Sequence, residues 1–172
     1  MSGVAVKVLA ADVLARLQGM EERGGNLSGV FRNFGEYMKG SIDKNFAAGG
    51  RPVKWQPLKI LSLLSWSYGF KKGGTHRTKK GGPTKAGRAA LAGRLPLTAS
   101  GVLRRSIHYA AESRAITIAA GPSDYAAIHQ FGGKAGRGRK VTIPARPYLM
   151  FQDEDVNYLE MTLVNYILTG QI

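Results

Sequence analysis

The spacing of apolar residues predicts one long helix in the first third of the chain. Between Asn26, a residue type that favours the N-cap position, and the pair Gly49 and Gly50, apolar side chains recur mostly every three or four residues. They are Leu27, Val30, Phe31, Phe34, Met38, Ile42 and Phe46. This spacing places them on one wide face, so we expect the helix to pack along the core.

The same patterns predict shorter elements along the rest of the chain, and together they indicate the fold class. In the first half of the chain we expect a strand over 4–9, a helix from 10 that stops at 24–25, the long helix, and a segment over 60–70 that fits either a helix or a strand. In the second half we expect a helical fragment over 89–94, a capped short helix near 98–100 and a hairpin over 107–119. A short helix at 125, a strand over 141–143 and a last helix up to 170 follow. This order predicts an α+β fold in a single domain over 1–172. We expect a small, mainly antiparallel sheet packed by the long helix of the N-terminal half and by the C-terminal helix, with long basic loops.

Charge changes this picture in the middle of the chain. The net charge is +14, and between Asp43 and Glu112 there is no acidic residue but there are fourteen Lys and Arg. Within this region, residues 71–88 hold two Gly pairs and too few apolar residues to order themselves, so we predict a flexible basic loop or arm. Its candidate partner-binding residues are Lys71, Lys72, Arg77, Lys79, Lys80 and Lys85. A surface with this excess of positive charge attracts polyanions or acidic proteins, although a plain solvated surface has the same composition.

Several classes of function lack the residues they need. There is no Cys, so no disulfide or thiolate metal site can form, and no apolar run reaches the roughly 20 residues that span a bilayer. The three histidines show no metal-ligand spacing, and no Ser lies in a nucleophile-elbow motif. We therefore expect no enzyme activity, no cofactor, no metal and no membrane partner. A small hydrolase that uses His129 is a weakly supported alternative, and it predicts turnover that His129→Ala abolishes.

The stretch from Tyr125 to Phe151 combines a core segment with an exposed loop. A short apolar segment stops at Gly132 and Gly133, and a return strand ends at Pro144. The loop between them carries the cations Lys134, Arg137, Arg139 and Lys140, which are candidate partner-binding residues.

Arg146, between Pro144 and Pro147, is a candidate for a specific ion pair. One interpretation pairs it inside the chain with Asp153 or Asp155, where it would brace the last helix. The other interpretation pairs it with a partner across an interface.

Four motifs occur in a familiar order: WQPL at 55–58, LTASGVLRRSI at 97–107, YAAIHQFGG at 125–133 and IPARPYL at 143–149. From about Phe31 to the C-terminus, the chain resembles the virion morphogenesis, or tail-completion, proteins of Mu-like tailed bacteriophages, which are related to tail-terminator and head–tail joining proteins. The segment 71–88 is longer and more basic than this resemblance leads us to expect. The motif residues that it marks as structural are Trp55, Tyr125, His129, Gln130, Gly132, Gly133, Pro144, Arg146 and Pro147.

The resemblance implies a structural protein of the virion, located at the head–tail junction or the tail end and assembled in the host cytoplasm. It also implies a homo-oligomer, for which a hexameric ring is one expected form, and partners among tail tube or head connector proteins. The basic loops could contact DNA non-specifically in the lumen of a ring, or dock on acidic protein surfaces. The alternative function is a non-sequence-specific nucleic-acid-binding protein that uses the basic middle region.

Overall fold

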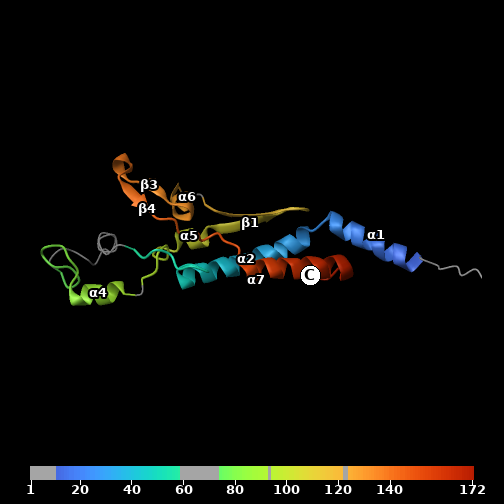
Figure 1. Cartoon of the computed structure of the whole chain (residues 1–172), viewed down its shortest axis with the longest axis horizontal. Helices are drawn as coiled ribbons and strands as arrows, with labels where there is room; N and C mark the ends of the chain where they lie inside the picture. Colours follow the sequence, from blue (N-terminus) through green and yellow to red (C-terminus); the bar gives the residue numbers. More distant parts are fainter. Residues whose placement is uncertain (1–10, 59–73, 93, 122–123) are drawn as a thin grey trace, which may run out of the picture. The chain divides into compact units, whose positions relative to one another are not determined.

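The computed structural model describes residues 11–58, 74–92, 94–121 and 124–172 (Figure 1). The expected strand over 4–9, the segment over 60–70, Lys71 and Lys72 lie outside the described residues. The elements are α1 (Ala11–Gly25), α2 (Ser28–Ala48), α4 (Lys85–Leu91), α5 (Val102–Arg105), β1 (Ile107–Ala111), β2 (Ile116–Ala120), α6 (Asp124–Phe131), β3 (Gly133–Ala135), the 3-10 turn η1 (Arg137–Arg139), β4 (Val141–Ile143) and α7 (Asp153–Thr169).

The fold is α+β, as the order of elements predicts, but its strands form two small sheets within the described residues. β1 pairs with β2 in a hairpin, and β3 pairs with β4 antiparallel, with Lys134 opposite Thr142. The sequence predicts β4, but it predicts an exposed loop at 133–135, where the structure has β3. Three residues with glycine at the first position carry little strand signal, and cross-strand pairing with β4 forms the strand instead.

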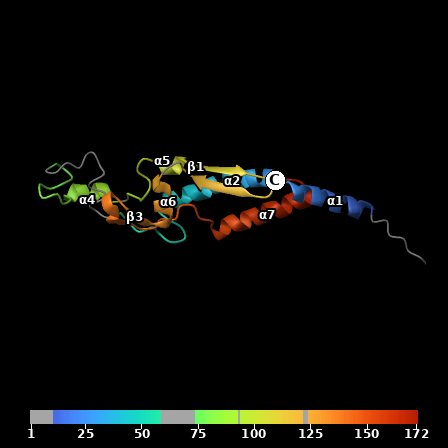
Figure 2. The ribbon, with the colours of Figure 1, turned by 90° about the horizontal axis from the view of Figure 1, so that it is seen from above.

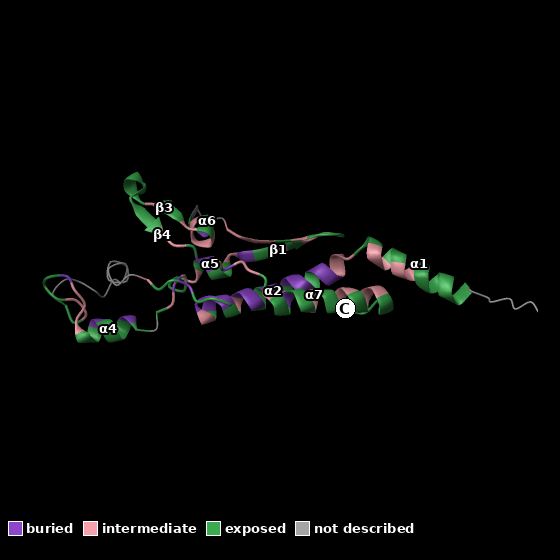
Figure 3. Ribbon diagram, viewed as in Figure 1, coloured by how far each residue is buried: buried purple, intermediate pink, exposed green. Residues whose placement is uncertain are grey.

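The long helix α2 begins and ends where the sequence predicts. The Asn26 side chain accepts a hydrogen bond from Ser28 N (3.1 Å) at its start, and Gly49 follows its end with φ +67°. The residues of its predicted apolar face from Val30 to Phe46 are nearly all buried, and Figure 3 shows buried positions recurring along this helix. Its two halves belong to two compact units of the chain. Unit 1 comprises 1–39, 108–118 and 151–172, and unit 2 comprises 40–107 and 119–150.

Unit 1 packs around aromatic side chains of α2 and α7. Phe34, fully buried, stacks on Phe151 and Tyr158 at centroid distances of 6.1 and 6.4 Å. Tyr37 stacks on Tyr158 at 3.9 Å, and the Tyr158 hydroxyl donates to Asn33 Oδ1 (2.7 Å). These contacts fix α7 along the first half of α2.

The first and the last described helices also contact each other in unit 1. α1 contacts α7, and Arg23 Nε donates to Ile167 O (2.7 Å); Figure 2 shows the C-terminal end of α7 beside α1. At the start of α7, the backbone N–H of Gln152 donates to the Asp155 carboxylate (2.7 Å) in a capping box, which agrees with the acidic helix start expected from the sequence. α1 has no buried residue, and its apolar side chains Val13, Leu14 and Leu17 are more than half exposed in the single chain.

The segment 74–92 contains more regular structure than its composition predicts. Thr84 Oγ1 accepts from Gly87 N (3.0 Å), so α4 begins at Lys85 rather than near residue 89. Before it, Thr78 N donates to Gly82 O (2.8 Å), and Arg77 Nε donates to Gly81 O (2.8 Å), which closes a turn. The predicted flexibility of 71–88 and the single domain over 1–172 stay predictions.

Two glycines of α2 provide a matched test of this packing. At Gly40 an added Cβ meets nothing within 4 Å, whereas at Gly35 it would lie 2.5 Å from Tyr109 Cδ2. We expect Gly40→Ala to raise the free energy of unfolding by about 0.5–1 kcal/mol, because alanine restricts the unfolded chain and favours the helix. Gly35→Ala should lower it, because the Tyr109 ring must move away from Glu36, to which its hydroxyl donates (2.9 Å). Urea unfolding followed by circular dichroism measures both, and an equal gain in the two variants would contradict this packing.

Candidate partner-binding site

The motif segment, residues 143–149, lies at the centre of unit 2 and is held by side chains from three other parts of the chain. The Gln130 side chain from α6 makes three of the bonds. Its Oε1 accepts from Tyr148 N (3.0 Å) and Leu149 N (3.1 Å), and its Nε2 donates to Leu149 O (3.0 Å). One side chain thereby replaces the strand neighbour that this extended segment lacks.

Two further side chains reach the same backbone from α2 and from the segment after it. Asn45 Nδ2 donates to Tyr148 O (3.1 Å), and Trp55 Nε1 donates to Pro147 O (3.0 Å). Asn45 is fully buried and Trp55 is 7% exposed, so both bonds are largely shielded from water. Asn45 is a site residue that sequence reasoning missed. Its signal was a polar side chain in the sequence position next to Phe46, on the apolar face of the long helix.

Aromatic packing completes this arrangement. Phe46 contacts Trp55 edge to face at 5.7 Å and Tyr148 at 5.6 Å. Tyr148 is 1% exposed, and its hydroxyl donates to Ala126 O (3.1 Å) in α6. Burial, with a smaller contribution from Tyr125, raises the pKa of the Tyr148 phenol.

Gly132 is required where α6 meets the motif segment. Its φ is +75°, and a Cβ there would lie 2.8 Å from Ala145 N. The close approach lets Arg146 N donate to His129 O (2.7 Å). Most of the predicted motif residues are thus brought together, and the hydrogen bonds of Gln130, Trp55 and His129 join them to the backbone of the motif segment.

Arg146 is buried in unit 2, with 4% of its surface exposed. Its Nε donates to Gln56 O (3.1 Å), and burial lowers the pKa of its guanidinium. By sequence, unit 2 contains only two carboxylates, Asp43 and Asp124. Asp43 pairs with Arg104 (2.6 Å), which lowers the pKa of that carboxyl. Pairing of Arg146 with Asp153 or Asp155, or with a partner, stays a prediction.

His129 shows the features of a structural imidazole. Burial, and then the charge of Arg146, lowers its pKa, so the neutral form is favoured at neutral pH. Its Nδ1 is buried and has no hydrogen-bond partner within the described residues, and its ring contacts Tyr125 edge to face at 6.0 Å. Among residues 11–58, 74–92, 94–121 and 124–172, no group of three or more acidic or histidine side chains is placed to hold a metal. No helix in that part of the chain is long and apolar enough to cross a bilayer.

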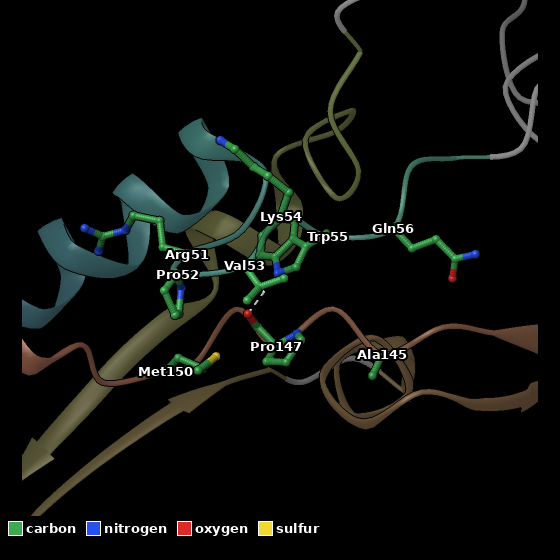
Figure 4. Close-up of a pocket in the computed structure, with 9 residues that line it drawn as sticks. All are labelled: Arg51, Pro52, Val53, Lys54, Trp55, Gln56, Ala145, Pro147 and Met150. Carbon is green, nitrogen blue, oxygen red and sulfur yellow. Dashed lines mark hydrogen bonds between the residues drawn. The ribbon is translucent and has the colours of Figure 1, made fainter.

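An open groove lies beside the motif segment (Figure 4). It has a volume of about 330 Å³, and most of its lining is apolar. Figure 4 shows Trp55 and Pro147 joined by their hydrogen bond, and Lys54 reaches the end of α2, where its Nζ donates to Ala48 O (2.6 Å). The lining residues are Arg51, Pro52, Val53, Lys54, Trp55, Gln56, Ala145, Pro147 and Met150.

The predicted cations of the 134–140 loop lie on the β3–β4 hairpin. Lys134, Arg137, Arg139 and Lys140 are all exposed, and within the described residues no hydrogen bond or ion pair engages their side chains. Gly136 and Gly138 take positive φ at the tip, and Arg139 does so at +53°. In the other basic segment, Lys79, Lys80 and Lys85 are exposed, whereas Arg77 is bound to its own turn.

Comparison with known proteins identifies the chain. The model of the phage virion morphogenesis family matches residues 9–167. The chain belongs to the phage virion morphogenesis family. It is also 31% identical over 146 residues to Mu-like prophage FluMu G protein 2 of Haemophilus influenzae. The aligned region covers 85% of this chain and 82% of that protein. No solved structure matches the chain.

Membership of this family agrees with the geometry of the site. It gives the chain a structural, virion-associated role in phage morphogenesis. The resemblance rested mainly on YAAIHQFGG and IPARPYL, and in the structure these two motifs hold each other through Gln130, His129 and Gly132.

The side-chain hydrogen bonds from Gln130, Asn45 and Trp55 to residues 147–149 are called the clamp below. Substitution of Gln130 tests how much the clamp contributes to stability. We expect Gln130→Ala to lower the free energy of unfolding by about 1–3 kcal/mol, because it removes three hydrogen bonds and leaves backbone groups unpaired. Gln56→Ala is the matched control. The Gln56 residue is exposed and contributes its backbone carbonyl, so the change should stay within about 0.5 kcal/mol. Denaturant unfolding of the two variants gives the comparison, and equal losses of stability would contradict the clamp.

Proposed function

We propose that the chain completes the phage tail or joins the tail to the head, as a homo-oligomeric and ring-forming component. The observation that carries this proposal is the family match over 9–167, supported by the similarity to a Mu-like prophage protein. The geometry is consistent with it, because the hydrogen bonds of the motif residues hold the subunit together.

The exposed surfaces of unit 2 fit a joining role. The β3–β4 hairpin presents four cations that no described residue engages, and it extends from a segment fixed by the clamp. Such a loop on a rigid support suits contact with an acidic tail tube or connector protein. A ring built from one kind of subunit needs two different contact surfaces on each subunit, and the two units differ in charge and in exposed side chains.

Deletion of the gene tests this proposal. In the phage genome that encodes the chain, we expect loss of the gene to give filled heads that are not joined to tails, or tails with unfinished ends, in negative-stain electron micrographs. Supply of the wild-type chain from a plasmid should restore joined virions. Normal virions without the chain would overturn the proposal.

Non-sequence-specific nucleic-acid binding is the second candidate, and the charge of unit 2 favours it. By sequence, unit 2 carries nineteen Lys and Arg but two Asp and Glu, a net charge of +17. Phosphate backbones are bound by such surfaces without reading of the bases.

Duplex binding at several salt concentrations measures this second candidate. If DNA is the partner, the triple variant K134Q/R137Q/K140Q should flatten the dependence of log K on log salt by about 0.9 for each phosphate that the variant no longer neutralises. The control R16Q/R32Q/R114Q removes three exposed cations of unit 1 and should leave the slope unchanged. Absence of binding at low salt would exclude this candidate.

A further inference from the structure

The charges of the chain are segregated between its two units. By sequence, unit 1 carries six Lys and Arg and nine Asp and Glu, a net charge of −3, while unit 2 has a net charge of +17. When two copies meet, like units repel and unlike units attract. The charge distribution therefore favours a contact between unit 1 of one copy and unit 2 of another.

The exposed face of α7 is both acidic and apolar. α7 contains Asp153, Glu154, Asp155 and Glu160 and no Lys or Arg. Its C-terminal half presents Met161, Val164 and Leu168, which are 74%, 57% and 57% exposed. Their spacing of three and four places them on one stripe, and Glu154 and Glu160 flank the same side of the helix. We call these three residues the α7 stripe.

The groove of unit 2 has the complementary chemistry. Its apolar wall includes Val53, which is 76% exposed, and its rim carries the exposed cation Lys54. The carboxylates of unit 2 are not among its lining residues. An apolar groove with a cationic rim suits an acidic helix with an apolar stripe better than it suits a phosphate backbone.

We propose that the α7 stripe of one copy docks in the unit 2 groove of a second copy. The contact joins two different surfaces, so each subunit offers one stripe and one groove, and repetition closes a ring or extends a filament. The exposed acidic residues of α7, Asp153, Glu154 and Glu160, then face the basic unit of the neighbour. This inference rests on the proposed function only in assuming that the chain self-associates.

Two variants, each with a matched control, test the contact. The stripe variant M161Q/L168Q replaces apolar side chains of the docking face by neutral polar ones, so it gains no attraction to an acidic groove, and its control L14Q/L17Q makes the same kind of change at leucines of α1 that are 57% and 54% exposed. The groove variant V53E/K54E makes the groove acidic, and its control V141E changes a valine of β4 that is 53% exposed. All the changes lie at exposed positions, and circular dichroism with thermal melting checks that each variant folds as the wild type does.

Light scattering after gel filtration gives the mass of each sample. We expect the wild type and both controls to form the same oligomer. Each docking variant should associate at least tenfold more weakly, and the wild-type oligomer should weaken as salt is added. A mixture of the two docking variants is the decisive sample, because the groove variant keeps its stripe and the stripe variant keeps its groove. Each pair then retains one intact contact, so the mixture should form a 1:1 dimer and nothing larger.

Three results would overturn the inference: a wild type that stays monomeric at every concentration, a groove variant that assembles like the wild type, or a mixture that stays monomeric. The deletion experiment distinguishes this failure from failure of the proposed function. Unjoined heads and tails after deletion, together with any of these three results, would retain the function and reject the contact. Normal virions together with the 1:1 dimer would retain the contact and reject the function.

Discussion

The backbone of residues 146–149 imposes the constraint on which the rest of unit 2 depends. This segment is buried at Arg146 and Tyr148 and half-buried between and after them, yet it lies in neither sheet, so its shielded polar groups need partners from side chains. Pro147 removes one donor. Gln130, Asn45 and Trp55 pair with the carbonyl of Pro147 and with both backbone groups of Tyr148 and Leu149. Each of these three side chains must match a donor or an acceptor at a fixed place, which gives a structural reason for a recognisable motif in this part of the sequence.

This constraint also links α2 to the function. Asn45 and Phe46 lie on the second half of α2 and hold the motif segment, while Phe34, on the first half, packs against α7. The same helix face therefore supports the clamp beside the groove in unit 2 and the helix that carries the α7 stripe in unit 1. A change in the apolar face of α2 would disturb both proposed surfaces, whereas changes on the β3–β4 hairpin would leave them intact.

The sequence was sufficient for the elements whose signal is local. The three-to-four spacing from Val30 to Phe46 predicted α2, and the acidic start of α7 agreed with its capping box. Local signals were insufficient where structure depends on distant partners. β3 forms through its pairing with β4, and the role of Asn45 depends on the carbonyl of Tyr148, 103 residues away. The predicted start of α4 is four residues too late, because the composition of this segment does not reveal that Thr84 caps the helix.

The candidate site shows the same difference between what local sequence signals predict and what depends on distant residues. Gly132, Gln130 and Trp55 were marked by a resemblance, but their bonds to the motif segment needed the fold. The predicted cations were a property of composition, and composition did not reveal that charge is divided between the units, because that division depends on which distant segments pack together. A net charge of +14 on a uniform surface would oppose every association of like copies. The same charge concentrated in one unit opposes only the contacts that join two basic units. Segregation of charge therefore allows the chain to attract a polyanion or an acidic partner and still bind its own copies in one orientation.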